Sequence, residues 1–215
     1  MQTDKIQVLS NGQGMEAALA ESEKYAAYMG IEGKSAIHLR LLTEELLGMV
    51  RAITGDFKAY FWIENQEGGG YRIHLDAETP MNLDKKTELI SLSSKGVNKV
   101  SGGFMGKIRD MVENGLYYYN KVDQLQLRNG IYTPVGVTAG ITPEGAGVDG
   151  FVWTMDEYRG KMKSARGSDP DASKAWDELE RSIVASIADD VVVSVRKNAV
   201  KITISKNGVF CSLGG

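Results

Sequence analysis

The sequence feature that most constrains the fold is the stretch from Gly33 to Gly55, which has helical periodicity and a glycine at each end. On a helical wheel one stripe of it is apolar, and the members of this stripe are Leu39, Leu42, Leu46, Met49 and Ile53. Ile37, Leu41 and Gly48 lie on roughly the opposite side. A helix that is apolar on two sides is normally sandwiched inside a domain. The stretch therefore predicts a central helix.

Glu44 stands beside this second side, one turn before Gly48, and has two open interpretations. A carboxylate on a buried helix face would be unusual, because burying an unpaired charge is unfavourable. Alternatively, Glu44 and Glu45 lie on an exposed flank and bond to water. Residue types alone favour the exposed flank. The order of the elements that follow favours the alternative, in which Glu44 belongs to a functional site.

Composition limits the class of protein. The 215 residues are 42% hydrophobic and 25% charged, which is typical of one large globular domain. The net charge of −3 gives no electrostatic reason to expect nucleic acid or an anionic membrane as a partner. A single cysteine, Cys211, excludes an internal disulfide framework and fits a reducing cytoplasm. No apolar run is long enough to span a bilayer, and the N-terminus has no export signal.

Local patterns give the order of the elements. The predicted elements are a strand (Lys5–Leu9), a helix (Met15–Met29), the central helix, a hairpin (Phe57–Glu64 and Tyr71–Asp76), a short helix (Asn82–Ser93), a helix (Ala175–Ala188) and a hairpin from Asp190 to Lys206 that turns at Lys197-Asn198. Between them, residues 94–170 form a glycine-rich, mostly irregular insertion with one helical piece, Met105–Asn114. This order predicts a single α+β domain over residues 1–215, a two-layer α/β sandwich with a mixed, mostly antiparallel sheet and helices on one face.

Three blocks of the sequence resemble a known superfamily in the same order. TEELLGMVRAITGD, from Thr43, resembles the N-box helix of the Bergerat-fold ATPases of the gyrase and histidine-kinase type, particularly the bacterial anti-sigma-factor serine kinases. YRIHLDAETP, from Tyr71, takes the place of the strand that ends in D-x-G-x-G. ELERSIVASIADDVVVSVRKNAVKITISK, from Glu178, resembles the last helix and closing hairpin. The insertion 94–170 falls where the superfamily carries its ATP lid.

The resemblance assigns roles to particular residues. Glu44 matches the catalytic carboxylate, and Asp76 matches the aspartate that binds the adenine amino group. Gly48 stands where an asparagine would hold Mg²⁺, and glycine offers no side-chain oxygen. Glu78 and Pro80 replace the glycines of D-x-G-x-G. For Asp76 a second interpretation stays open, in which it caps the turn Ala77-Glu78-Thr79 at the end of a strand.

The start of the last helix also departs from the superfamily. Residues 178–182, ELERS, replace a glycine-rich segment whose amides cradle phosphate, and the two carboxylates, Glu178 and Glu180, would repel a triphosphate. Phosphoryl transfer depends on positioning and charge neutralisation. We therefore expect a retained scaffold with little or no catalysis, in which ATP or ADP remains a candidate ligand and Mg²⁺ is doubtful.

The insertion holds a second phosphate candidate, SGGFMGKI from Ser101, with Gly102, Gly103 and Lys107 as its binding residues. Its spacing departs from the P-loop because Ser101 and Ile108 stand where glycine and Ser/Thr belong. A glycine-hinged lid with a basic helix start is the preferred interpretation.

The histidines, His38 and His74, have no partners at metal-ligand spacing, so we expect both to be structural and predict no metal site. No nucleophile-elbow motif is present. Trp153 and Tyr158 pack in the core or the insertion, or alternatively form an interface anchor.

Three functions follow as hypotheses. The favoured one is a degenerate regulatory module with a protein partner, sigma-factor-like or anti-anti-sigma-like by resemblance only, and weak or absent nucleotide binding. The second is an active ATP-dependent serine kinase whose insertion supplies the missing ligands. The third is a ligand-free scaffold protein, which is homo-oligomeric or bound to a partner. All three are expected in the cytoplasm.

Overall fold

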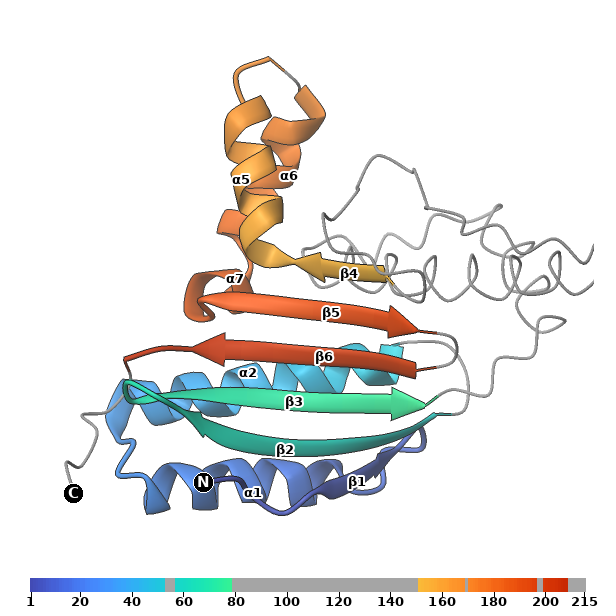
Figure 1. The fold of residues 1–215 in the computed structure, drawn as a ribbon, viewed down its shortest axis with the longest axis vertical. Coiled ribbons are helices and arrows are strands. Elements are labelled where there is room, and N and C mark those ends of the chain that lie inside the picture. The colour runs from blue at the N-terminus through green and yellow to red at the C-terminus, as the bar shows by residue number, and fades with distance from the viewer. Residues whose placement is uncertain (53–56, 79–150, 169, 197–198, 209–215) are drawn as a thin grey trace, which may run out of the picture.

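The computed structural model of the chain describes residues 1–52, 57–78, 151–168, 170–196 and 199–208. One antiparallel sheet organises these residues, and its six described strands follow the order β1-β2-β3-β6-β5-β4 (Figure 1). The strands are β1 (Ile6–Leu9), β2 (Lys58–Gln66), β3 (Gly70–Glu78), β4 (Phe151–Thr154), β5 (Asp190–Arg196) and β6 (Ala199–Lys206). Every pairing among them is antiparallel, so the prediction of a mixed sheet was wrong in that detail.

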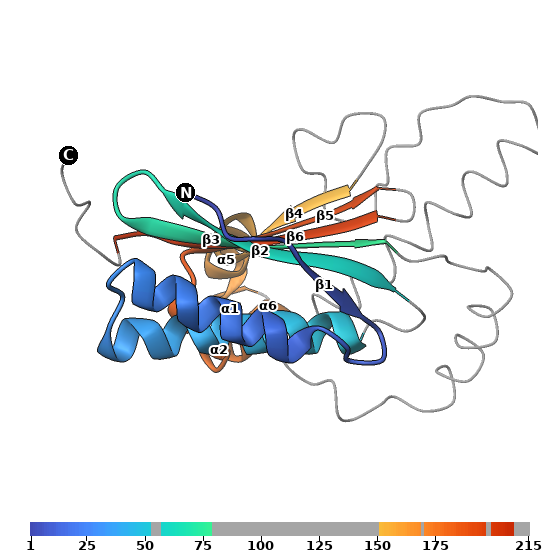
Figure 2. The ribbon, with the colours of Figure 1, turned by 90° about the horizontal axis from the view of Figure 1, so that it is seen from below.

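The described helices are α1 (Met15–Tyr28), α2 (Gly33–Ala52), α5 (Met155–Ala165), α6 (Pro170–Glu180) and α7 (Ile183–Ile187). Helices α1 and α2 form an antiparallel pair that covers one face of the sheet (Figure 2). Helix α7 packs on α2, and α5 and α6 extend past the β4 edge (Figure 1). The predicted α+β class is confirmed.

The core lies between the sheet and the α1–α2 pair. Alternation along β2 buries Ala59, Phe61 and Ile63 on the helix side, as a half-buried strand requires. The apolar stripe of α2 meets this face, and Leu39, Leu42 and Leu46 are fully buried. Burying a leucine side chain stabilises a fold by roughly 1.5–3 kcal/mol. The sheet and the central helix therefore stabilise each other.

The predicted second apolar face of α2 was wrong. Ile37 is 58% exposed, Leu41 is half-buried and Gly48 is exposed. Helix α2 is buried along one broad stripe that also includes Thr43 and Leu47. Over residues 33–48, where the side chains are described, it has one buried face and one exposed face.

The two hairpins share one sheet although they are far apart in sequence. Strand β3 of the first pairs with β6 of the second, with Ile73 opposite Ile204 and Leu75 opposite Ile202. The register thus joins the central part of the chain to its C-terminal part through apolar cross-strand pairs.

Two stretches differ from the predictions. The end of the segment predicted as irregular forms β4 and α5, and β4 pairs with β5 at the edge of the sheet. The predicted helix Ala175–Ala188 is two helices, α6 and α7, which are separated at Arg181-Ser182. The side chain of Ser182 caps α7 by accepting from the amide of Ala185 at 3.2 Å.

Several predictions lie outside the described residues. They are the helices Asn82–Ser93 and Met105–Asn114, the lid-position glycines Gly102 and Gly103 with Lys107, the turn Lys197-Asn198, Cys211, and Ile53 of the apolar stripe. The backbone of Met49 is helical, and its side chain is not described.

Candidate functional site

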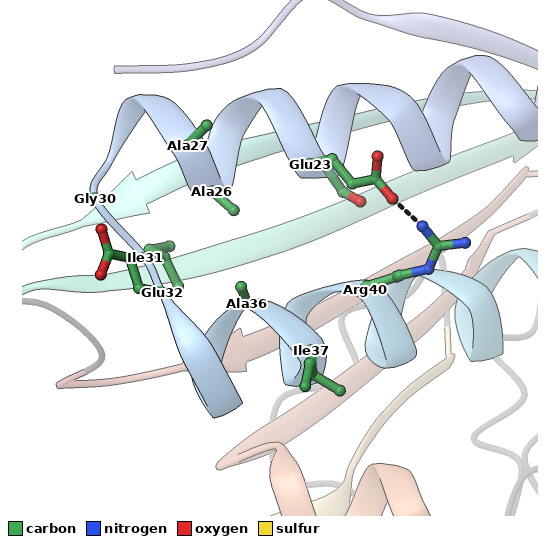
Figure 3. Close-up of a pocket in the computed structure, with 10 residues that line it drawn as sticks. Glu23, Ala26, Ala27, Gly30, Ile31, Glu32, Ala36, Ile37 and Arg40 are labelled. Carbon is green, nitrogen blue, oxygen red and sulfur yellow. Dashed lines mark hydrogen bonds and ion pairs between the residues drawn. The ribbon is translucent and has the colours of Figure 1, made fainter.

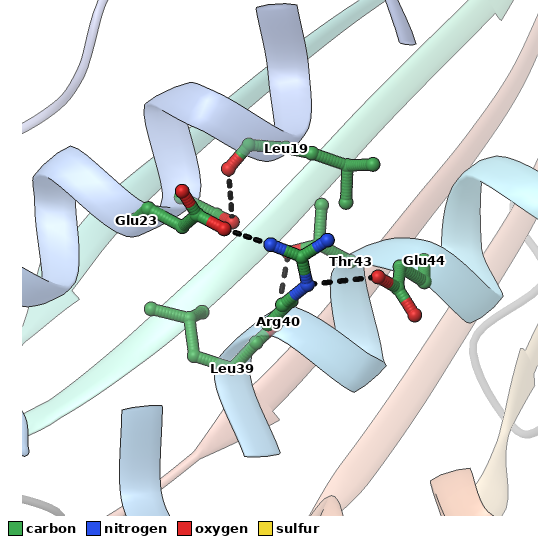
Figure 4. Close-up of polar contacts among 7 residues, drawn as sticks. Leu19, Glu23, Leu39, Arg40, Thr43 and Glu44 are labelled. Carbon is green, nitrogen blue, oxygen red and sulfur yellow. Dashed lines mark hydrogen bonds and ion pairs between the residues drawn. The ribbon is translucent and has the colours of Figure 1, made fainter. Parts of the chain in front are cut away.

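Glu44 lies on the exposed flank of α2, in a network of ion pairs that joins α2 to α1 (Figure 4). Nε of Arg40 donates to Oε1 of Glu44 at 2.9 Å, and Nη1 of the same guanidinium donates to Glu23 of α1. The Glu44 side chain is 41% exposed, as the exposed-flank interpretation predicts, although it pairs with Arg40 and Glu45 is half-buried. Exposed ion pairs of this kind contribute at most about 1 kcal/mol each.

Gly48 follows Glu44 by one turn and is also exposed. A Cβ built at this position would meet no described atom within 4 Å. The described neighbours therefore leave space for a Cβ at this position, and their packing gives no reason for a glycine there.

Asp76 lies on the other side of the fold. Its neighbours along β3, Leu75 and Ala77, are buried toward the helices, so the side chain of Asp76 points to the opposite face of the sheet. There Nζ of Lys201 on β6 contacts Oδ2 of Asp76 at 3.0 Å. Strand β3 continues through Glu78, so the interpretation of Asp76 as a cap of the turn 77–79 was wrong.

The structure therefore does not bring Glu44 and Asp76 together. Glu44 lies on the exposed flank of α2, whereas Asp76 lies on the face of β3 opposite to the one that the α1–α2 pair covers. Each carboxylate already has a cationic partner, Arg40 and Lys201 respectively. The two matched carboxylates therefore belong to different layers of the fold.

The third matched segment, residues 178–182, spans the end of α6 and the break before α7. Glu178 is half-buried and Glu180 is exposed. The amide of Ala185 at the start of α7 already bonds to Ser182. The two carboxylates that the resemblance singles out therefore belong to the last turn of α6.

A polar cluster on the outer face of the sheet had no signal in the sequence analysis. The rings of Trp62 and His74 stack with centroids 4.8 Å apart, and Nζ of Lys5 lies 4.2 Å from the centre of the Trp62 ring. Nε2 of His74 lies 3.1 Å from Oε1 of Glu64, and its Nδ1 lies 3.2 Å from Oγ1 of Thr203. Cross-strand register could have revealed it, because His74 is opposite both Trp62 and Thr203.

A hydroxyl, an imidazole and a carboxylate in line have the order of a nucleophile, a base and an orienting acid. Acyl transfer also needs donors aimed at an oxyanion. The backbone amides around His74 are used by the antiparallel ladders with β2 and β6. We therefore interpret the cluster as a cross-strand structural network, as predicted for His74.

Two tyrosines are buried between α1 and the sheet. Tyr25 of α1 is 2% exposed and Tyr71 of β3 is fully buried, and neither hydroxyl has a hydrogen-bond partner among the described residues. Burial, with a smaller contribution from Glu64, raises the pKa of Tyr25 to about 12. Burial also raises the pKa of Tyr71, with Tyr25 and Asp189 as further causes. Both phenols therefore stay protonated at neutral pH.

His38 is on α2, near Lys34 and Lys206. Desolvation is the main cause that lowers its pKa, and the two lysines lower it further. Within the described part of the chain, no group of three or more His, Cys, Asp or Glu side chains is arranged to hold a metal ion.

A groove of about 540 Å³ lies between the second half of α1 and the first half of α2 (Figure 3). Ala26 and Ile31 are its buried apolar residues, and Ile37 stands exposed at its edge. Glu32 lies at the turn between the helices, and Glu23 with Arg40 lies at the other end. Residue patterns do not predict this groove, although Arg40 and Glu44 have the spacing of a helical ion pair.

None of the family models, characterised proteins or solved structures compared with the chain matches it. None of the helices within the described ranges is long and apolar enough to cross a membrane. The functional interpretation therefore depends on the geometry of the described residues.

Proposed function

We propose that this chain is a regulatory, protein-binding module built on a Bergerat-type scaffold, with weak or no nucleotide binding. The arrangement of the elements supports the scaffold part. Helix α2 packs on a sheet that contains both hairpins, β2–β3 and β5–β6. Helices α6 and α7 precede the second hairpin, in the order that the resemblance implies.

The main support for weak or absent nucleotide binding is the separation of Glu44 from Asp76. Phosphoryl transfer needs its groups positioned around one nucleotide. Here Glu44 lies on the flank of α2 and Asp76 on the far face of β3, and each is paired with a neighbouring cation. Gly48 adds no metal ligand beside Glu44.

Calorimetric titration of the full chain with ATP and with ADP, each with and without Mg²⁺, tests the proposal. We expect no saturable binding, or weak binding that does not require Mg²⁺ and is unchanged in Glu44→Ala and Asp76→Ala. Tight, Mg²⁺-dependent binding that either substitution removes would overturn the proposal.

Gly48→Asn makes the test more stringent, because it restores the amide oxygen that the superfamily uses at this helix position. A Cβ at this position meets no described atom within 4 Å. Since Asp76 lies on the other face of β3, we expect Gly48→Asn to gain no Mg²⁺-dependent affinity for ATP. A clear gain would show that a nucleotide site exists beside α2 and that only one ligand was missing.

The two other hypotheses give different results. An active serine kinase would release ADP in the presence of its protein substrate, and Glu44→Ala would abolish this turnover. A purely self-associating scaffold would appear as a stable oligomer by light scattering with no affinity for another protein. Either result would replace the proposed function.

A further inference from the structure

We propose that the groove between α1 and α2 is the docking site for a partner protein's amphipathic helix with basic residues at both ends of its apolar face. This inference deepens the proposed function, because it assigns the protein-binding surface and the chemistry of the partner. It is drawn from the shape, exposure and charge of the groove.

The shape of the groove suits a helix. It lies between two antiparallel helices, and a third helix can pack there ridge into groove (Figure 3). Three of its lining residues are alanines and one is glycine (Ala26, Ala27, Ala36 and Gly30), so a partner backbone can approach closely. From Glu23 the groove follows α1 to the end of the helix and continues to Gly30, seven positions on, which is a span of roughly 10 Å.

The exposure of Ile37 indicates that the groove is incomplete. Ile37 lines the groove and is 58% exposed, and Tyr28, in the last turn of α1, is 74% exposed. Single exposed apolar residues are ordinary on protein surfaces. Here, however, Ile37 stands at the edge of a concave apolar surface, which is the arrangement that helix-in-groove recognition uses.

The charges select the partner. Glu32 at the turn is exposed and has no ionic partner among the described residues. At the other end Arg40 pairs both with Glu23, which lines the groove, and with Glu44, one turn beyond it on α2, so these three side chains keep one net negative charge. A partner helix with Lys or Arg about seven positions apart, flanking apolar residues at i, i+3 or i+4, would complement both ends.

The same charges disfavour a second copy of this chain as the occupant. A symmetric contact through α1 would bring its own glutamates, Glu16, Glu21 and Glu23, toward the acidic groove of the other copy, and α1 carries only Lys24 as a cation. Like charges brought together at an interface oppose association.

The experiment is a selection from a displayed library of single amphipathic helices, with the full chain as the target. The flanking positions of the library encode Lys, Glu or Gln at random. We expect the enriched helices to carry Lys at both flanks of the apolar face. As synthetic peptides, they should lose about tenfold or more in affinity for Ile37→Ser and for Glu32→Lys.

Glu16→Lys is the matched control, because it makes the same charge change on α1 outside the groove, and it should keep full affinity. A peptide with Glu at the flank next to the turn should bind Glu32→Lys better than the natural chain. Circular dichroism melting checks that each variant is folded; all the substituted side chains are exposed.

Three results would overturn the inference: no enriched helices, enriched helices without basic flanks, or binding that Ile37→Ser leaves unchanged. A dimer in solution that Ile37→Ser dissociates would assign the groove to a second copy and overturn it too. Nucleotide calorimetry is a separate measurement. Tight ATP binding would reject the proposed function and would not affect the peptide result. Failure of the peptide selection would reject the docking site and would not affect the calorimetric result.

Discussion

At the scale of single residues, Gly14 has the least space for a side chain among the described glycines. It precedes α1 with a φ of 87°, and a Cβ built there would lie 1.9 Å from the carbonyl oxygen of Gln7. We expect Gly14→Ala to lower the free energy of unfolding by about 2 kcal/mol or more, from the strain and the clash together.

Gly12 is the matched control for this substitution. Its φ of 90° is also positive, but a Cβ there would meet nothing within 4 Å. Gly12→Ala should therefore lose only the conformational preference, about 1 kcal/mol. Urea denaturation of both variants measures the difference, and equal losses would show that the contact between residue 14 and β1 does not matter.

The buried tyrosines predict a dependence on alkaline pH. An unfolded tyrosine has a pKa near 10, and burial raises the pKa of Tyr25 to about 12. Because the folded state holds this proton more tightly, the contribution of the protonated phenol to the free energy of unfolding is fully present below pH 10. It is lost as the pH rises toward 12. We expect Tyr25→Phe to weaken this loss, in urea denaturation between pH 7 and pH 11.

At pH 7 the same substitution should be neutral or slightly stabilising, because the Tyr25 hydroxyl has no hydrogen-bond partner among the described residues. Tyr28→Phe is the control on the same helix, since Tyr28 is 74% exposed. A loss above about 1 kcal/mol for Tyr25→Phe at pH 7 would mean that the hydroxyl is bonded in the protein, for example to a buried water.

Residue alternation by itself predicts the face of the sheet on which Asp76 lies. In YRIHLD the apolar residues Tyr71, Ile73 and Leu75 form one phase, and Asp76 belongs to the other phase with Arg72 and His74. A period of two puts these phases on opposite faces of a strand. The resemblance placed Asp76 beside a nucleotide, whereas the alternation predicts the face that the structure has.

At the scale of elements, Arg159 connects α5 to the end of α7. Its Nη1 donates to the carbonyl oxygen of Asp189 at 3.2 Å, and its Nη2 donates to that of Ala185 in α7. A cation at a helix C-terminus satisfies free carbonyls and interacts favourably with the helix dipole. Arg159→Ala should therefore lower the free energy of unfolding by about 2 kcal/mol.

Lys161→Ala is the control for this element, because Lys161 is exposed on the same helix and should contribute less than about 0.5 kcal/mol. Thermal or urea unfolding gives the comparison, and hydrogen exchange of the α7 amides shows whether the loss is local. If the two variants were equally stable, the Arg159 contacts would not hold α5 against α7.

The missed elements explain why sequence patterns found only part of the fold. Strand β4 is short, and α5 is mostly polar with one fully buried residue, Met155, so neither gives a strong apolar period. A capping signal was nevertheless present, since Thr154 accepts from the amide of Glu157 in the arrangement T-x-x-E. By contrast, the apolar period runs on across Ser182, so the pattern merged α6 and α7 into one helix.

At the scale of the whole molecule, long apolar periods were sufficient for the α1–α2 pair and both hairpins. The α1–α2 groove could not be found in this way, because it depends on how two helices lie side by side. Glu23 and Arg40 meet across seventeen positions of sequence. Spacing rules cover contacts within one helix or one hairpin and do not reach such a pair.

Strand β4 belongs to the same sheet as β2 and β3, although residues 79–150 separate them in the sequence. The buried residues of all the described strands form one hydrophobic cluster, which includes Phe61 on β2 and Trp153 on β4. A shared core unfolds cooperatively. We therefore expect one unfolding transition for both parts of the chain.

Two single-tryptophan variants measure this directly, because the chain has only three tryptophans, Trp62, Trp153 and Trp176. One variant keeps Trp62 on β2 and the other keeps buried Trp153 on β4, with phenylalanine at the remaining positions. Within each variant, the urea midpoint from fluorescence should equal the midpoint from far-UV circular dichroism, since both signals follow one core. If the Trp153 signal changed at a lower urea concentration than the dichroism, β4 and α5 would unfold separately, and the sheet would not be one cooperative unit.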